Sequence, residues 1–368
     1  MNKPNETFFL VRFSYYVTSF RLFCWRLFAG YKNKMIYGST FRGYASQDKL
    51  FIQGRISRYR YIKNNPEASP LEHLLDTIKR IFNTRIPDIP CEISVLNHIF
   101  LTTTNSAGYF TLEINWPSPF YPSCSCWLNV AIEVKPILDF YIEKSTLTGE
   151  ILFISNKQKF IVISDIDDTL LLTGVKSMFY WKVLYNTFLK NMEQRRGIPG
   201  APAFFQRLTQ LKNQADWQTF VFYVSSTPRT LYDFVLTWLD RCHFPKGPIL
   251  LKDFGLSTLD KGASQRFKSK LAWIKHVMSF FPTIPFVLVG DSGEKDFFLY
   301  QKLAEEYPTM VKAILIRDIP FLRSKNKLVQ AMDDFKNDVP LCLFKDYKEA
   351  RIWVQNYLPE LMDINELR

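Results

Sequence analysis

The chain has 368 residues, 47% of them hydrophobic and 22% charged, which is the composition of a folded globular protein and excludes a largely disordered chain. Its formal net charge of +12 predicts an anionic partner, either a phosphorylated substrate or an anionic membrane surface. No short Lys/Arg block resembles a nucleic-acid-binding tail, so we expect no nucleic acid, and the six scattered cysteines and four unpaired histidines argue against a disulfide scaffold and a zinc enzyme.

Residues 1–32 form an aromatic and basic segment. Its apolar run is interrupted by Arg12, Arg21 and Arg26, which argues against a cleaved signal peptide and against a membrane-spanning helix. We expect the protein to be cytoplasmic. Two interpretations of this segment remain open. The segment is either a helix that packs on the domains behind it, or an interfacial helix that docks the protein peripherally on anionic membranes, with its arginines on lipid phosphates.

Residues 33–154 are predicted to form a small β-rich, sandwich-like domain, because short apolar or alternating runs are separated by turn residues. The predicted strands cover residues 50–61, 92–101, 109–114, 127–134 and 151–154. A helix is predicted over 71–82, where leucine and isoleucine recur at helical spacing. This part of the sequence carries no catalytic constellation.

Residues 155–368 alternate apolar strands with amphipathic helices, which predicts an α/β domain with a parallel sheet. The predicted strands cover residues 160–163, 220–224, 248–251, 286–289, 313–316 and 341–344. A short insert, residues 174–200, lies between the first two of these strands. It leaves no large cap domain to close over a small substrate, which favours a bulky or membrane-borne one.

The first strand of this domain runs directly into a cluster of carboxylates, Ser164-Asp165-Ile166-Asp167-Asp168-Thr169. In open α/β sheets the chemistry lies just beyond the carboxyl ends of the strands. Asp165 and Asp167 are two residues apart, so on an extended chain they would point to the same side. Two carboxylates so close favour a shared hard cation such as Mg²⁺. A solvated acidic loop and a Ca²⁺ loop are the alternatives.

Two further candidates follow along the chain. Ser225 stands at the end of the strand over 220–224, where a hydroxyl can bind a phosphoryl oxygen, although a helix N-cap is the alternative. Lys270 stands at the start of a predicted helix, where its ammonium group can offset carboxylates and a phosphate dianion. The alternative for Lys270 is an ordinary solvated lysine.

The strand over 286–289 runs into Gly290-Asp291-Ser292-Gly293-Glu294-Lys295-Asp296. The two glycines are predicted to permit a tight turn. Asp291 can then reach a metal ion at the carboxyl end of its strand, and Asp296 can support it from the helix that follows.

Together these motifs resemble a known family. Asp165-x-Asp167-x-Thr169 behind a hydrophobic strand resembles the first motif of the haloacid-dehalogenase-like phosphatases. The complete run from Ser164 to Thr169 resembles the narrower actin-patch phosphatidate phosphatase family, and the run over 290–296 resembles that family's Gly-Asp-Ser-Gly-x-x-Asp motif. The resemblance implies a haloacid-dehalogenase-like, Rossmannoid parallel sheet with a short cap insert.

The chain departs from the family pattern at three motifs. It has Ser225-Ser226-Thr227-Pro228 where Ser-Asn-Ser-Pro is usual, and it has Ser269 where a histidine usually precedes the lysine. The first serine, the proline and the lysine itself are kept. After the Gly-Asp-Ser-Gly-x-x-Asp motif the chain has Phe297 where a proline is common. The departures therefore put the helper residues in doubt and leave Ser225 and Lys270 as candidates.

The resemblance also implies a Mg²⁺-dependent reaction through an aspartyl-phosphate. Asp165 would be the nucleophile, and Asp167 would protonate the leaving group and then activate water. The metal would be held by the Asp165 carboxylate, the backbone carbonyl of Asp167 and the Asp291 carboxylate.

The remaining motif residues would act around this centre. Ser225 and Lys270 would hold the phosphoryl oxygens, and Lys270 would also stabilise developing charge. Thr169 would order the loop, Asp296 would support from the helix, and Asp168 would be structural and exposed.

The favoured function is a phosphatase that hydrolyses phosphatidic acid to diacylglycerol, and the expected partner is phosphatidic acid or another phosphorylated lipid. A second hypothesis is a phosphatase of soluble phosphomonoesters or phosphoproteins. A third, from a different class, is a membrane or cytoskeletal binding protein without catalysis. The complete set of motifs argues against the third hypothesis, because an inactive relative would be free to lose Asp165 or Asp167.

Overall fold

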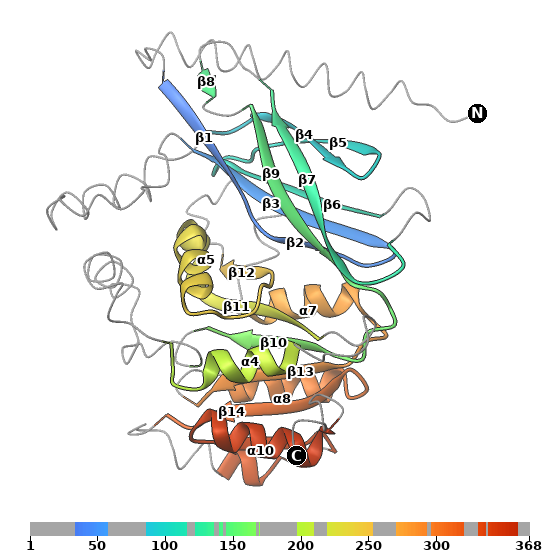
Figure 1. Ribbon diagram of the computed structural model, residues 1–368, viewed down its shortest axis with the longest axis vertical. Helices are drawn as coiled ribbons and strands as arrows, with labels where there is room; N and C mark the ends of the chain where they lie inside the picture. The colour runs from blue at the N-terminus through green and yellow to red at the C-terminus, as the bar shows by residue number, and fades with distance from the viewer. Residues whose placement is uncertain are drawn as a thin grey trace, which may run out of the picture.

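The computed structural model describes most of the chain and shows a mixed α/β fold, with a largely antiparallel sheet followed by a parallel one (Figure 1). The described residues are 34–57, 86–115, 122–135, 140–142, 145–166, 169, 197–209, 219–252, 270–292, 296–319, 330–335 and 338–359. The segment 1–32, the continuation of a strand over 58–61, the helix over 71–82 and most of the insert over 174–200 lie outside them.

The first sheet has nine strands in the order β5-β4-β7-β9-β2-β3-β1-β8, with β6 beside β3. Their bounds are β1 Lys34–Thr40, β2 Gly43–Ala45, β3 Lys49–Ser57, β4 Pro90–Val95, β5 His98–Thr103, β6 Tyr109–Asn115, β7 Cys126–Val134, β8 Phe140–Ile142 and β9 Thr146–Phe153. Alternate residues of these strands point inward, as the period of two requires, and bury one apolar core. A Cβ at Gly149 of β9 would lie 3.3 Å from Ile52 of β3, so strands that are not hydrogen-bonded neighbours face each other across that core.

The prediction of one strand over 92–101 is wrong. The chain forms two strands there, β4 and β5, which pair as an antiparallel hairpin with Val95 opposite His98. The turn contains Leu96, whose φ of 51° lies in the left-handed region, and Asn97. Asn97 is the turn-forming residue, but the apolar side chains on both sides of it favour one continuous strand. The sequence patterns also do not predict β1, β2 and β8.

The second sheet has six parallel strands in the order β12-β11-β10-β13-β14-β15, which confirms the predicted α/β fold with a parallel sheet. Their bounds are β10 Ile161–Asp165, β11 Phe220–Pro228, β12 Ile249–Lys252, β13 Phe286–Asp291, β14 Val311–Arg317 and β15 Leu341–Phe344. The first strand, β10, lies in the middle of the sheet. β11 and β12 follow on one side of it, and β13, β14 and β15 follow on the other. The direction of winding therefore reverses between β10 and β13, which is where doubly wound sheets bind their ligands.

Helices cover both faces of the parallel sheet (Figure 1). Side chains of α4 (Ala201–Thr209), α5 (Tyr232–Arg241) and α10 (Tyr347–Tyr357) share one core with Val162. Side chains of α7 (Lys270–Phe280) and α8 (Asp296–Glu306) share the other with Ile161 and Ile163. Burial on both faces explains why β10 is apolar at every position before Ser164. No helix in the part of the chain that the structure describes is long and apolar enough to cross a membrane.

The antiparallel sheet packs on helices α5 and α7 of the parallel sheet through aromatic side chains. Tyr44 of β2 is fully buried against α7, where its hydroxyl makes a hydrogen bond with Nδ1 of His276. Phe41 stacks on Tyr232 of α5, with ring centroids 4.0 Å apart. These contacts fasten the antiparallel sheet to the helices that position the site. The division into folding domains at residues 154 and 155 stays a prediction.

Candidate active site

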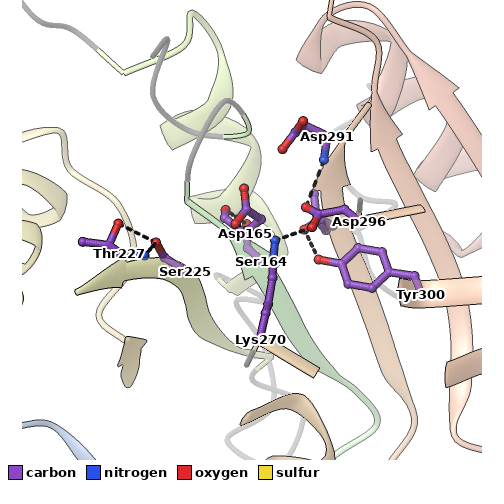
Figure 2. A network of polar contacts seen from close by, with 9 residues as sticks. Ser164, Asp165, Ser225, Thr227, Lys270, Asp291, Asp296 and Tyr300 are labelled. Atoms are coloured by element: carbon purple, nitrogen blue, oxygen red, sulfur yellow. Dashed lines mark hydrogen bonds and ion pairs between the residues drawn. The ribbon is translucent and has the colours of Figure 1, made fainter. Parts of the chain in front are cut away.

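Three buried carboxylates meet at the carboxyl ends of β10 and β13, on either side of the point where the winding reverses (Figure 2). Asp165 is the last residue of β10, Asp291 is the last residue of β13, and Asp296 is the first residue of α8. One oxygen atom from each lies within 4.8 Å of the others, and none of the three residues is exposed by more than 1%. The structure thus brings together three of the candidate residues.

Lys270 reaches this cluster from the start of α7, as Figure 2 shows. It is the first residue of α7, and its Nζ lies 2.6 Å from Oδ1 of Asp165 and also donates to Oδ1 of Asp296. Burial by itself lowers the pKa of Lys270, but the charges of Asp165 and Asp296 outweigh it and hold the pKa well above the ordinary value. Lys270 is therefore a buried ammonium ion at neutral pH, and the interpretation as an ordinary solvated lysine is wrong.

The charges of the described cluster fit a divalent cation. Three carboxylates face one ammonium group. Arg317 lies opposite Asp291 in the register of β13 and β14, and negative charge remains in excess even if Arg317 is counted as a second cation. Buried charges are stable only when they are compensated. Carboxylate oxygens are also the ligands that Mg²⁺ prefers, so Asp165 and Asp291 could hold this ion.

Gly290 lies inside β13, so the prediction that it serves a tight turn is wrong. Its φ is not in the left-handed region. A Cβ at this position would lie 2.6 Å from Oδ2 of Asp296 and 2.8 Å from Cε2 of Tyr300. The missing side chain therefore makes room for Asp296 to approach the backbone, where its Oδ2 accepts from the Asp291 amide at 3.4 Å.

Gly290→Ala should displace Asp296 from Lys270. We expect it to destabilise the fold by about 1–3 kcal/mol through overpacking and to lower turnover by roughly tenfold or more through misplacement of charged groups. Gly149→Ala is the matched control, because a Cβ there would lie 3.3 Å from the Cδ1 atom of Ile52, a tight contact that a small shift of this side chain relieves and that is far longer than the 2.6 Å at Gly290. Urea unfolding and turnover of both variants measure the effect, and equal losses in the two would contradict it.

Tyr300 of α8 supports the cluster and is not predicted from the sequence. Its hydroxyl donates to the carbonyl oxygen of Val289 at 3.0 Å, which ties α8 to β13 beside the site (Figure 2). Burial first, and then the charge of Asp296, raise the pKa of Tyr300 well above the ordinary value. The hydroxyl therefore remains a donor at neutral pH.

Ser225 lies on the strand next to Asp165, one residue beyond Val224, which pairs with Asp165. Its Oγ lies 2.7 Å from Oγ1 of Thr227 and accepts from the Thr227 amide at 2.9 Å. The alternative that Ser225 is a helix N-cap is wrong, because β11 continues to Pro228 and the next helix, η2 (Arg229–Leu231), has no side-chain cap. Ser225 thus stands at the same edge of the sheet as the cluster.

Thr169 is fully buried and its carbonyl oxygen accepts a hydrogen bond from Tyr347 of α10, another residue that sequence reasoning misses. The remaining motif positions lie outside the described residues. These are Asp167, Asp168, Ser269 and Gly293.

Comparison with known proteins places a family match over this part of the chain. Residues 160–318 match the family model described as the catalytic domain of phosphatidate phosphatase APP1. The chain is 29% identical over 259 residues to phosphatidate phosphatase APP1 of Saccharomyces cerevisiae, a similarity that covers 66% of this chain and 40% of the yeast protein. The chain thus spans less than half of the length of that relative.

Solved structures add little to the assignment. A carbohydrate acetylesterase from Xanthomonas citri matches with 8% identity over 75% of this chain and 66% of its own, at a TM-score of 0.25. EndoBT-3987 from Bacteroides thetaiotamicron matches with 10% identity over 88% of this chain and 90% of its own, at a TM-score of 0.18. At such TM-scores neither structure informs the fold or the function.

Proposed function

We propose that the chain is a Mg²⁺-dependent phosphatase that hydrolyses phosphatidic acid to diacylglycerol, because residues 160–318 match the family of phosphatidate phosphatase APP1 catalytic domains. The observation that carries the proposal is the buried cluster of Asp165, Asp291, Asp296 and Lys270, which lies inside the matched region. A fold of the haloacid-dehalogenase-like, Rossmannoid type is part of the proposal. The strand order, with Asp165 at the end of the first and central strand, supports it.

In the proposed reaction a carboxylate oxygen of Asp165 attacks phosphorus while the bond from phosphorus to the diacylglycerol oxygen breaks. Asp167 gives its proton to that oxygen, and diacylglycerol leaves. Asp167 then takes a proton from water as the water oxygen attacks phosphorus, which releases inorganic phosphate and restores the Asp165 carboxylate. Asp167 lies outside the described residues, so its role rests on the Asp-x-Asp motif.

Lys270 and Ser225 support both steps. Lys270 fixes the Asp165 carboxylate through Oδ1, and its charge offsets the negative charge that builds up on the transferring group. Ser225, at the adjacent strand end, would bind a phosphoryl oxygen. Asp296 keeps Lys270 in place from α8.

The Asp165 and Asp291 carboxylates, with the backbone carbonyl of Asp167, would hold Mg²⁺. When bound, this ion offsets charge on the phosphoryl group and orients it. Asp291 can bind the ion because β13 and β10 are parallel neighbours, so the fully buried Asp291 and Asp165 lie at the same edge of the sheet.

Two alternatives remain, a phosphatase of soluble phosphomonoesters or phosphoproteins and a binding protein without catalysis. Docking of residues 1–32 on anionic membranes also remains a proposal. Phosphate release from phosphatidate in detergent micelles and from para-nitrophenyl phosphate, each with Mg²⁺ and with a chelator, separates the functions. We expect Mg²⁺-dependent release with a preference for phosphatidate. Preference for the soluble ester would favour the first alternative, and no release from either would favour the second.

A further inference from the structure

The hydroxyl of Tyr347 holds the backbone just after the catalytic strand. It donates a 2.8 Å hydrogen bond to the carbonyl oxygen of Thr169, a residue 178 positions earlier in the chain. Tyr347 is 3% exposed and Thr169 is fully buried. Because a buried carbonyl that loses its donor has no water to replace it, this bond strongly favours one position of the backbone at Thr169.

The position of Tyr347 is fixed independently of Thr169. Its ring packs against Phe204 and Phe205 of α4 and Phe344 of β15, with centroids 5.2, 6.0 and 5.2 Å away. Tyr347 is the first residue of α10, and Asp346 caps that helix by accepting from the amides at positions 348 and 349. The hydroxyl is therefore presented by a rigid element.

Asp167 lies in sequence between two anchored residues. On one side Ile166, 2% exposed, packs in the same apolar core as Tyr347, and on the other side Thr169 accepts the Tyr347 bond. Burial raises the pKa of Tyr347, Arg317 lowers it, and the carboxylates of Asp165 and Asp291 raise it, with a net shift well above the ordinary value. The hydroxyl is thus a permanent donor at neutral pH and lies close enough to the site to interact with its charges.

We propose that Tyr347 is a positioning residue of the active site, whose hydroxyl fixes the backbone at Thr169, the last residue of the Asp-x-Asp-x-Thr motif, and thereby supports the acid role proposed for Asp167. Tyr347 acts through the backbone and does not contact substrate. The inference rests on the proposed function. It extends that function to a residue on the last described helix, outside the range 160–318 of the family match.

Tyr347→Phe removes the hydroxyl and keeps the ring. We expect the rate of the first step, measured as pre-steady-state release of the leaving group, to fall by roughly tenfold or more with phosphatidate, which has a poor leaving group, and by less than about twofold with para-nitrophenyl phosphate, because acid assistance matters less for a good leaving group. Asp167→Asn should show the same asymmetry in this step to a larger degree, while its second step, in which Asp167 is the base, should be slow for both substrates. Tyr223→Phe is the matched control, since this buried tyrosine also donates to a carbonyl oxygen, that of Pro245, at 2.8 Å.

A second readout does not depend on activity. Amide hydrogen exchange of peptides that span residues 166–170 should be roughly fivefold faster in Tyr347→Phe than in the wild type, the factor expected for one net hydrogen bond, and unchanged in Tyr223→Phe.

The outcomes separate the inference from the function on which it rests. Equal loss of the first-step rate on both substrates, or a Tyr223→Phe control that reproduces the asymmetry, would overturn the positioning role. Unchanged exchange in Tyr347→Phe would overturn it as well. A wild-type protein that hydrolyses neither substrate would overturn the proposed function, and the exchange measurement would still decide whether Tyr347 holds the segment.

Discussion

Asp165→Asn should abolish turnover and leave the fold intact. Asparagine keeps the shape of the side chain, and its carbonyl oxygen can still accept from Lys270, but the amide cannot attack phosphorus. We expect turnover of para-nitrophenyl phosphate to fall by about 10⁴-fold or more, as for other enzymes that lose their nucleophile. The midpoint of thermal unfolding should change little, because Lys270 keeps its contact with Asp296.

Asp240→Asn is the control for this substitution, because Asp240 is an exposed carboxylate of α5 that pairs with Arg42. It should leave turnover unchanged. Turnover retained by a correctly folded Asp165→Asn protein would remove Asp165 as the nucleophile, whereas loss in both variants would point to a change in the fold.

Lys270→Met should have the largest effect on stability. Methionine fills much of the same volume but leaves the buried carboxylates of Asp165 and Asp296 without their shared cation. Removal of one partner from a buried ion pair typically costs about 3–5 kcal/mol in the free energy of unfolding. Turnover should fall with it, because the charge that fixes Asp165 is lost.

Lys275→Met is the matched control on the same helix. Lys275 pairs with Glu306, and both side chains are about a third exposed to solvent, so solvent screens the pair and its loss should change stability little. Urea unfolding of both variants without added metal measures the difference. Similar losses of stability in the two variants would mean that groups other than Lys270 compensate the charges of Asp165 and Asp296.

The parallel sheet and the four residues of the cluster could be predicted because their signals are local. A strand buried on both faces is apolar without alternation, and it stops being so at Ser164 and Asp165. The carboxyl ends of parallel strands lie at one edge of a sheet, so Asp165 and Asp291 could be expected to meet. The order of the motifs along the chain then indicated Lys270 and Asp296.

Tyr300 and Tyr347 could not be predicted, because their roles arise from contacts that no local pattern encodes. Tyr347 reaches a carbonyl group 178 residues away, and the cap at Asp346 indicates only where its helix begins. The role of Gly290 was missed for a related reason, since its need for space depends on how α8 returns to β13. The hairpin of β4 and β5 was missed because Asn97 is a single turn-forming residue between two short stretches that both favour a strand.

The most direct test of the account is to trap the phosphoryl group on Asp165. In Asp167→Asn the base of the second step is missing, while para-nitrophenyl phosphate needs little help from an acid in the first step, so the aspartyl-phosphate should accumulate. Acid quench followed by mass spectrometry of peptides should find one phosphoryl group on the peptide that contains Asp165, and none in the Asp165→Asn Asp167→Asn double variant. Continued turnover of this substrate by Asp167→Asn without a phosphorylated peptide, or with the phosphoryl group on another residue, would contradict the account.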